Sequence, residues 1–170
     1  MKWPVNSSYD DRCNLGVSVT ESIEPKPRLD AAFIGLRCTS VIRFGEESWR
    51  FEFEGRTTLD VRCPWRIVAD GRVALGNSDH GRQFGLPKPL DGKQEAERLL
   101  VASVAKVSLR EQTGDLILEL EQSTSLEIFN SSSGYEGWEC SSTDGLLAVA
   151  MGGGGISVWM TDPPLASGRP

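Results

Sequence analysis

"WRFEFE", Trp49–Glu54, alternates strictly between aromatic and charged residues. Its aromatic side chains fall on one face of an extended chain, and its charged side chains fall on the other. A period of two with aromatic residues is typical of a half-buried antiparallel strand. "TLDVRC" (58–63) alternates in the same way, and Gly55-Arg56 lies between the two strands where a tight hairpin turn belongs. With the apolar stretch "SVIRF" (40–44) before them, these residues predict a three-stranded antiparallel meander.

A similar pattern returns in the second half of the chain as "VSLRE", "LILELE" and "SLEIFN", within residues 107–130. Sliding the chain by 67 residues places residues 38–63 over residues 105–130 without a gap, with five identical positions. Apolar positions meet apolar positions, and outward glutamates meet outward glutamates. Two explanations are open: a true internal duplication, or convergence of two exposed hairpins on the same pattern. Either one predicts two three-stranded meanders.

One helix is predicted between these halves, over Asp91–Val104. This stretch is rich in good helix formers, and Asp91 is a suitable N-cap. The preceding "DHGRQFGLPKPL" (79–90) is predicted to be a loop because of its glycines and prolines. The fold class that follows is α+β, mainly antiparallel β, with about ten strands in two similar β-meander halves joined by one helix.

The two ends of the chain differ from this centre. Residues 1–30 are polar and interrupted by prolines, so we expect a poorly ordered or edge segment, with Leu15–Thr20 as one edge strand. Residues 162–170 are a proline-rich tail with little to bury. Residues 31–161 are therefore expected to form a single β-rich domain.

The charge of the chain excludes some partners. A net charge of −6 over 170 residues, without a stripe of Lys and Arg, argues against nucleic acid, because phosphate binding needs clustered cations. No stretch approaches the roughly 18 apolar residues of a membrane-spanning helix, and the first thirty residues lack a signal-peptide pattern. We expect a cytoplasmic protein with reduced thiols and no membrane association.

The run Gly152–Gly155 raises the question of a phosphate cradle. Such a loop needs a strand before it and a helix N-terminus after it. Here the run is followed by "ISVW" (156–159), which alternates like a strand, and no Lys-Ser or Lys-Thr pair follows. The glycines are therefore predicted to form a turn or bulge between the strands "LLAVAM" (146–151) and "ISVW", with an aromatic side chain as a candidate for covering it.

No residue set predicts catalysis, a metal site or a cofactor. The cysteines (Cys13, Cys38, Cys63 and Cys140) have no zinc-site spacing, and His80 is the single histidine. No motif places a nucleophile near His80, so we expect it to be a surface loop residue. The outward glutamates of the meanders (Glu52, Glu54, Glu119 and Glu121) are typical of solvated strand faces.

The candidate binding residues lie in "SSGYEGWEC" (132–140) and at the final strand: Tyr135, Glu136, Trp138 and Trp159. If exposed, a Tyr and a Trp on either side of an acidic residue would make a good anchor for a protein partner, since these types dominate binding hot spots. If buried, they would form a corner of the core.

The block "FNSSSGYEGWEC" (129–140), followed by "GLLAVAMGGGGISVW" (145–159), resembles a family of small bacterial proteins of unknown function. The resemblance covers Asp115–Trp159; residues 48–63 match only by pattern, and residues 1–30 do not match. It assigns no role to its most recognisable positions, which are Tyr135, Glu136, Trp138, Gly153, Gly154 and Trp159. Such proteins are similar in size and style to immunity proteins of bacterial polymorphic toxin systems, which bind and block one toxin.

Three hypotheses for function follow. The first is a non-enzymatic protein-binding module of the immunity type, with an acidic face set against a basic toxin. The second is a small-ligand-binding or structural domain, for example a homo-oligomer that pairs edge strands. The third is an enzyme whose site these motifs do not reveal.

Overall fold

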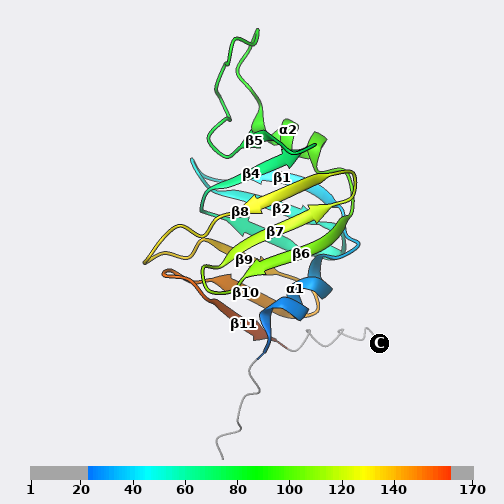
Figure 1. Ribbon diagram of the computed structural model, residues 1–170, viewed down its shortest axis with the longest axis vertical. Helices are drawn as coiled ribbons and strands as arrows, with labels where there is room; N and C mark the ends of the chain where they lie inside the picture. The colour runs from blue at the N-terminus through cyan, green and yellow to red at the C-terminus, as the bar shows by residue number, and fades with distance from the viewer. Residues whose placement is uncertain (1–22, 162–170) are drawn as a thin grey trace, which may run out of the picture.

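The computed structural model describes residues 23–161, which form eleven strands, two α-helices and one short 3₁₀ helix (Figure 1). The first half of the chain forms α1 (Pro25–Phe33), β1 (Cys38–Arg43), β2 (Trp49–Phe53), η1 (Glu54–Arg56), β3 (Thr58–Val61), β4 (Trp65–Ala69) and β5 (Arg72–Gly76). The second half forms α2 (Gly92–Leu99), β6 (Val104–Arg110), β7 (Asp115–Leu120), β8 (Thr124–Ile128), β9 (Trp138–Ser141), β10 (Leu146–Ala150) and β11 (Ile156–Met160).

The strands form two antiparallel sheets, so the predicted α+β class with mainly antiparallel β structure is confirmed. One sheet has the order β1-β2-β3-β9-β10-β11, and the other has the order β5-β4-β8-β7-β6. The inner faces of both sheets contribute to one core. At its centre the rings of Trp49 and Trp65 meet edge to face at 5.1 Å, and Phe51 meets Trp65 at 5.3 Å. Two of the inward aromatic residues of "WRFEFE", Trp49 and Phe51, thus pack directly against Trp65 of the other sheet.

Each predicted meander forms, and each lies in a different sheet: β1-β2-β3 in the first and β6-β7-β8 in the second. Each is then extended by strands from the other half of the chain: β9, β10 and β11 extend the first sheet, and the hairpin β4–β5 extends the second. Strand β9 of the hairpin β9–β10 pairs with β3, and β4 of the hairpin β4–β5 pairs with β8. The two halves therefore exchange hairpins between the sheets.

The two helices also occupy roughly equivalent places in the two halves of the fold. Helix α1 packs against β6, β10 and β11, whereas α2 packs against β1, β4 and β5. Each helix also carries a lysine paired with a carboxylate one turn later, Lys26 with Asp30 in α1 and Lys93 with Glu97 in α2. The second pair follows the first by the same 67 residues that relate the meanders. Both explanations of the repeat, duplication and convergence, stay open.

The sequence prediction of a single helix and of a poorly ordered or edge segment over residues 1–30 is wrong for residues 25–30. These residues begin α1, with a proline in its first turn, where no intrahelical N–H bond is lost. Helix α2 is shorter than predicted: it starts after the cap Asp91, whose carboxylate accepts the N–H groups of Lys93 and Gln94, and ends at Leu99. The predicted strand over Leu15–Thr20 and the predicted tail lie outside the described residues.

Three strands are absent from the sequence prediction. Strands β4 and β5 lie in the stretch after Cys63, and β9 follows the glycine-rich loop 131–137. Their omission matters because the chain passes from one sheet to the other immediately before β4 and again immediately before β9. Among the described residues, neither helix is long and apolar enough to cross a membrane.

Candidate protein-binding surface

A depression of about 730 Å³ lies where three connecting segments meet: the β1–β2 loop, the β3–β4 link and the loop before β9. We call it the acidic depression. Its lining residues are Glu47, Arg62, Cys63, Pro64, Ser131, Ser132, Tyr135, Glu136, Gly137 and Glu139. Two of the predicted binding residues, Tyr135 and Glu136, therefore lie together at one concave site.

Tyr135 stands on the wall of this depression with 81% of its surface exposed. Its position is fixed through the backbone rather than through the ring. The backbone N–H groups of Gly134 and Tyr135 both donate to the Ser132 hydroxyl, at 3.2 and 2.9 Å. The hydrogen-bonded loop has little backbone freedom left to lose on binding, and a tyrosine has only two side-chain torsions to fix, which favours its use as an anchor.

The glycine run lies directly behind this loop. Gly152–Gly155 form the turn between β10 and β11, as predicted, and the last three residues have positive φ. A Cβ on Gly152 would come within 2.5 Å of the Gly134 carbonyl carbon, and one on Gly154 within 2.1 Å of the Gln112 carbonyl oxygen. What lies against the run is thus the backbone of two other loops, rather than an aromatic side chain.

Asn130 ties these loops together, and sequence reasoning missed it. Its side-chain amide donates to the carbonyl oxygens of Thr113 and Met151, at 2.9 and 2.8 Å. Its backbone N–H donates to the Asp115 carboxylate at 3.0 Å. The only signal in the sequence is an Asn at the end of a strand and before a Ser/Gly cluster, which is common in loops.

The charges at the acidic depression are mostly negative. Glu47, Glu136 and Glu139 line it, against a single cation, Arg62. A nearby guanidinium, Arg50, is occupied: it forms two hydrogen bonds to the buried Asp60 at 2.6 and 2.7 Å, and this contact raises the pKa of Arg50. The depression therefore suits a cationic group, which an aromatic face such as that of Tyr135 also attracts.

Trp138 and Trp159 do not join this site. Trp138 is 0% exposed, and its indole N–H donates to the Gly114 carbonyl oxygen at 2.7 Å, so of the two alternatives for this residue, an exposed anchor or a corner of the core, the structure shows the second. It is a core residue between Gly137 and Glu139, which line the depression. Trp159 is 47% exposed but lies on β11, at the far edge of the six-stranded sheet, and does not line the depression.

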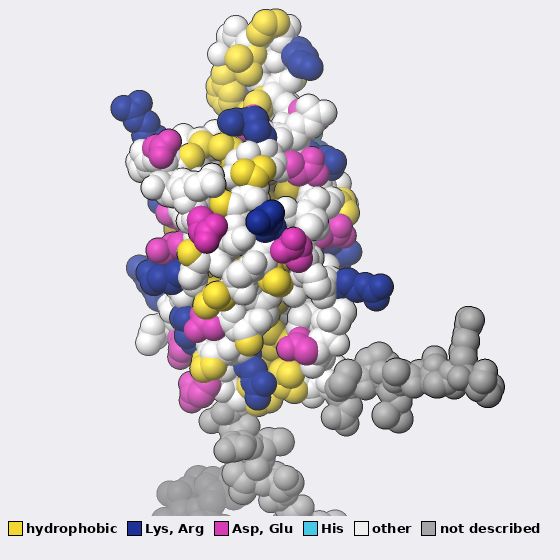
Figure 2. Space-filling view, turned by 90° about the vertical axis from the view of Figure 1, so that its right-hand side faces the viewer, with side chains coloured by type: hydrophobic (Ala, Val, Ile, Leu, Met, Phe, Trp, Pro, Cys, Tyr) yellow, Lys and Arg dark blue, Asp and Glu magenta, His cyan; other side chains and the backbone are white. Residues whose placement is uncertain are grey.

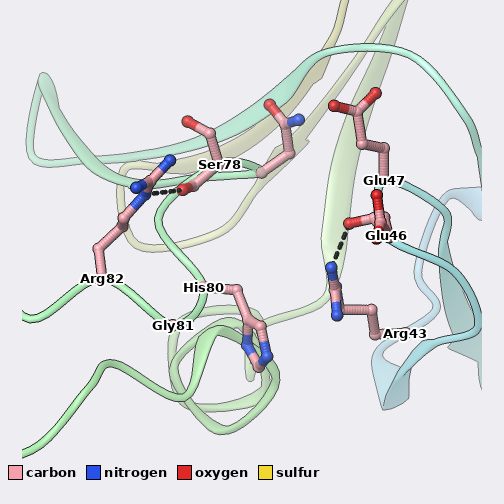
Figure 3. Close-up of a pocket in the computed structure, with 8 residues that line it drawn as sticks. Arg43, Glu46, Glu47, Ser78, His80, Gly81 and Arg82 are labelled. Carbon is pink, nitrogen blue, oxygen red and sulfur yellow. Dashed lines mark hydrogen bonds between the residues drawn. The ribbon is translucent and has the colours of Figure 1, made fainter.

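A second, smaller depression of about 460 Å³ adjoins the first and shares Glu47 with it (Figure 3). It is lined by polar residues of the β1–β2 loop and of the segment after β5. Here Arg43 donates to the Glu46 carbonyl oxygen, and Arg82 donates to the Ser78 carbonyl oxygen at 3.4 Å (Figure 3).

His80 lines this second depression, but its contacts are structural. Its Nδ1 accepts the backbone N–H of Gly92 at 3.1 Å, and its ring meets Trp49 edge to face at 5.8 Å. The residue lies in a loop, as predicted, and its side chain is half-buried. Within residues 23–161, His80 forms no hydrogen bond with a Ser, Cys or Asp side chain, so no nucleophile–base pair is assembled there.

The thiols in the described part of the chain are poor nucleophiles. Burial is the main reason that the pKa of Cys38 and that of Cys63 are raised to about 12, and it raises the pKa of Cys140 as well. Over the same residues, no three His, Cys, Asp or Glu side chains gather as a metal site would need. Cys13 lies outside the described residues.

A family model described as a family of unknown function (DUF6188) matches residues 23–160, so the chain belongs to this family. The match extends over both halves of the fold, well beyond the region 115–159 on which the sequence resemblance rests. No curated protein and no solved structure matches the chain.

Proposed function

We propose that this member of the family of unknown function DUF6188 is a non-enzymatic protein-binding module. The observation that carries the proposal is Tyr135, an 81%-exposed aromatic side chain on a hydrogen-bonded loop at a concave site with three carboxylates. Rigid aromatic anchors beside complementary charge are the usual source of affinity in protein interfaces. The partner that fits is a protein with a basic, protruding group.

The resemblance to immunity proteins narrows this proposal. We propose that the module acts in the bacterial cytoplasm and that its partner is a basic toxin. Inhibition would be steric and electrostatic: the partner's Lys or Arg side chains enter the acidic depression, and Tyr135 packs against them. Neither nucleic acid nor a membrane is a partner in this proposal, in keeping with the net charge of −6.

A second candidate function is a structural homo-oligomer, and one observation favours it. Strand β11 is an edge of the six-stranded sheet, and it carries the exposed side chains Trp159 and Met160. An unpaired edge with exposed apolar residues is able to pair with a second copy. Small-ligand binding in the acidic depression is the remaining alternative.

The test begins with the tagged full-length protein in lysate of its native cell. Bound proteins are identified by mass spectrometry, and the size of the purified complex is measured by light scattering. We expect one basic partner in fixed ratio, with an affinity that falls as salt rises. Partner-free monomer would contradict the proposal, whereas self-assembly through β11 would favour the second candidate.

Matched variants then locate the interface. Tyr135→Ala and Glu136→Lys remove the anchor and reverse a charge at exposed positions, so the fold should persist. Glu121→Lys makes the same charge reversal at an exposed turn between β7 and β8 of the other sheet. We expect the first two variants to weaken the complex at least about tenfold, and the third to leave it nearly unchanged. Equal effects of both charge reversals would mean that only net charge matters.

A further inference from the structure

The segment between β5 and α2 projects from the end of the sandwich as the most prominent part of the molecule (Figure 1). Its outer part, residues 81–90, is called the projecting loop here. Backbone hydrogen bonds close its stem: Gly81 N–H donates to the Leu90 carbonyl at 2.9 Å, and Leu90 N–H donates to the Arg82 carbonyl at 2.8 Å. The His80–Gly92 contact ties its base to α2. These hydrogen bonds give the projecting loop a defined conformation.

The tip of this loop is apolar. Phe84 is 68% exposed and Leu86 is 44% exposed, although neither contributes to the core. Phe84 also has a φ of 43°, in the left-handed region that a bulky residue rarely occupies. A strained, solvent-exposed phenylalanine gives the isolated protein no packing in return. Strained, exposed residues of this kind are typical of ligand contacts.

The charges on the projecting loop are opposite to those of the whole protein. Residues 81–90 include Arg82 and Lys88 and no Asp or Glu, in a chain with a net charge of −6. The space-filling view shows this part of the molecule as a hydrophobic surface with dark blue cationic side chains beside it (Figure 2). An apolar tip on a loop that also carries two cations, Lys88 and, at the stem, Arg82, is complementary to an apolar cleft with an acidic rim.

We propose that Phe84 and Leu86 of the projecting loop insert into an apolar, acid-rimmed cleft of a partner protein, with Arg82 and Lys88 paired to the rim. This proposal rests on the proposed protein-binding function and adds a second contact to it. The base of the loop lines the depression that adjoins the acidic depression, so one partner is able to meet both. A loop that fills this cleft would block it sterically, in addition to the contact at the acidic depression.

A membrane is the competing target for an apolar tip with flanking cations, and the observations favour a protein. Stable membrane attachment requires a large buried apolar area or more than one lipid-binding signal. Two side chains provide little area, and the carboxylates that line the acidic depression would be repelled by anionic lipids. A protein cleft, by contrast, encloses both side chains from all sides.

The test replaces Phe84 with the photocrosslinker p-benzoylphenylalanine in the full-length protein and irradiates it in native lysate. Val73, 60% exposed on the edge strand β5, receives the same substitution as the control position. We expect position 84 to crosslink to a peptide of the partner that contains apolar residues beside Asp or Glu, and position 73 to give no such product. Equal crosslinking from both positions, or no protein product from position 84, would overturn the proposal.

Binding measurements with the captured partner separate this inference from the proposed function. Phe84→Ala should weaken the complex at least about tenfold and Val73→Ala less than about twofold. If Tyr135→Ala weakens binding and Phe84→Ala does not, the protein-binding function stands and the inference fails. If no complex forms at all, both fail. A crosslink to a second copy of the chain, or binding to phosphatidylglycerol vesicles that Phe84→Ala abolishes, would replace the partner cleft with those targets.

Discussion

Gly152 lies directly against the backbone of Tyr135: a Cβ at position 152 would come within 2.6 Å of the Tyr135 amide nitrogen. No real Cβ makes such a contact with backbone, so the loop that carries Tyr135 keeps its position only while residue 152 has no side chain. The position of Tyr135 in the acidic depression therefore depends on the absence of a side chain at Gly152.

Gly152→Ala is therefore expected to destabilise the protein by about 1–3 kcal/mol, because the added methyl group must push the loop away. Urea unfolding followed by circular dichroism measures this loss. Gly155→Ala is the matched control: its φ is 83°, but its Cβ would contact nothing within 4 Å. Backbone strain alone should cost it about 1 kcal/mol. A variant at position 152 that is no less stable than the control would contradict the steric argument.

Trp138→Phe is expected to lower the free energy of unfolding by about 1–3 kcal/mol. The change removes the indole N–H that satisfies the buried Gly114 carbonyl and leaves a small void in the core. Urea denaturation of both proteins measures the difference. Trp159→Phe makes the same substitution at an exposed position, where we expect a change within about 0.5 kcal/mol. Similar losses at both positions would refute the assigned role of Trp138.

The contacts of the Glu97 carboxylate predict that the free energy of unfolding falls in acid. The backbone N–H of Val41 donates to its carboxylate at 3.1 Å, and this bond, together with Lys93, holds the pKa of Glu97 below its usual range. The unfolded chain thus binds the proton more readily than the folded one. The contribution of Glu97 is present above the ordinary glutamate pKa and is lost as pH falls through the lowered value.

Glu97→Gln should accordingly be less stable than the wild type at pH 7, by about 0.5 kcal/mol. The difference should shrink between about pH 5 and pH 3, because the wild type loses its advantage there. Thermal unfolding at each pH follows this change. A difference that stays constant across the range would mean that the charge of Glu97 is irrelevant to the helix–strand contact.

The burial of the Cys63 thiol predicts that the free energy of unfolding falls in alkali. Burial, with a smaller contribution from Asp115, raises the pKa of this thiol to about 12, whereas the pKa of a thiol in the unfolded chain is about 8.5. Its contribution is complete below the unfolded value and declines by up to about 1.4 kcal/mol per pH unit above it. Cys63→Ala should therefore lose less stability than the wild type between pH 8 and pH 10 in urea titrations. Parallel curves would show that the thiol is not shielded.

The period-two pattern predicts the two meanders because each has one buried face, and alternation along the chain reports that burial directly. Helix α1 could not be predicted from its sequence pattern, because Pro25 and Pro27 are typical of helix breakers. A proline in the first turn loses no hydrogen bond, so the same residues are compatible with a helix start. Only the packing of Leu29 and Phe33 into the core shows that the helix forms.

The candidate site could be predicted in part. Exposed aromatic and acidic residues in a glycine-rich loop indicate Tyr135 and Glu136, but the same cue fails for Trp138, three positions later, where β9 turns its side chain inward. Glu47 and Arg62 reach the site from distant parts of the chain. Their placement depends on the pairing of β3 with β9, which no local pattern encodes.

The exchange of hairpins has a consequence for how the chain reaches its native state. Strand β3 needs β9 as its neighbour, and β8 needs β4, so each sheet joins residues that are far apart in sequence. Contacts of such long range slow folding, and an unpaired β3 would expose an apolar edge until β9 has been synthesised. We expect neither half to fold when expressed alone, and the nascent chain to stay prone to aggregation until β9 leaves the ribosome.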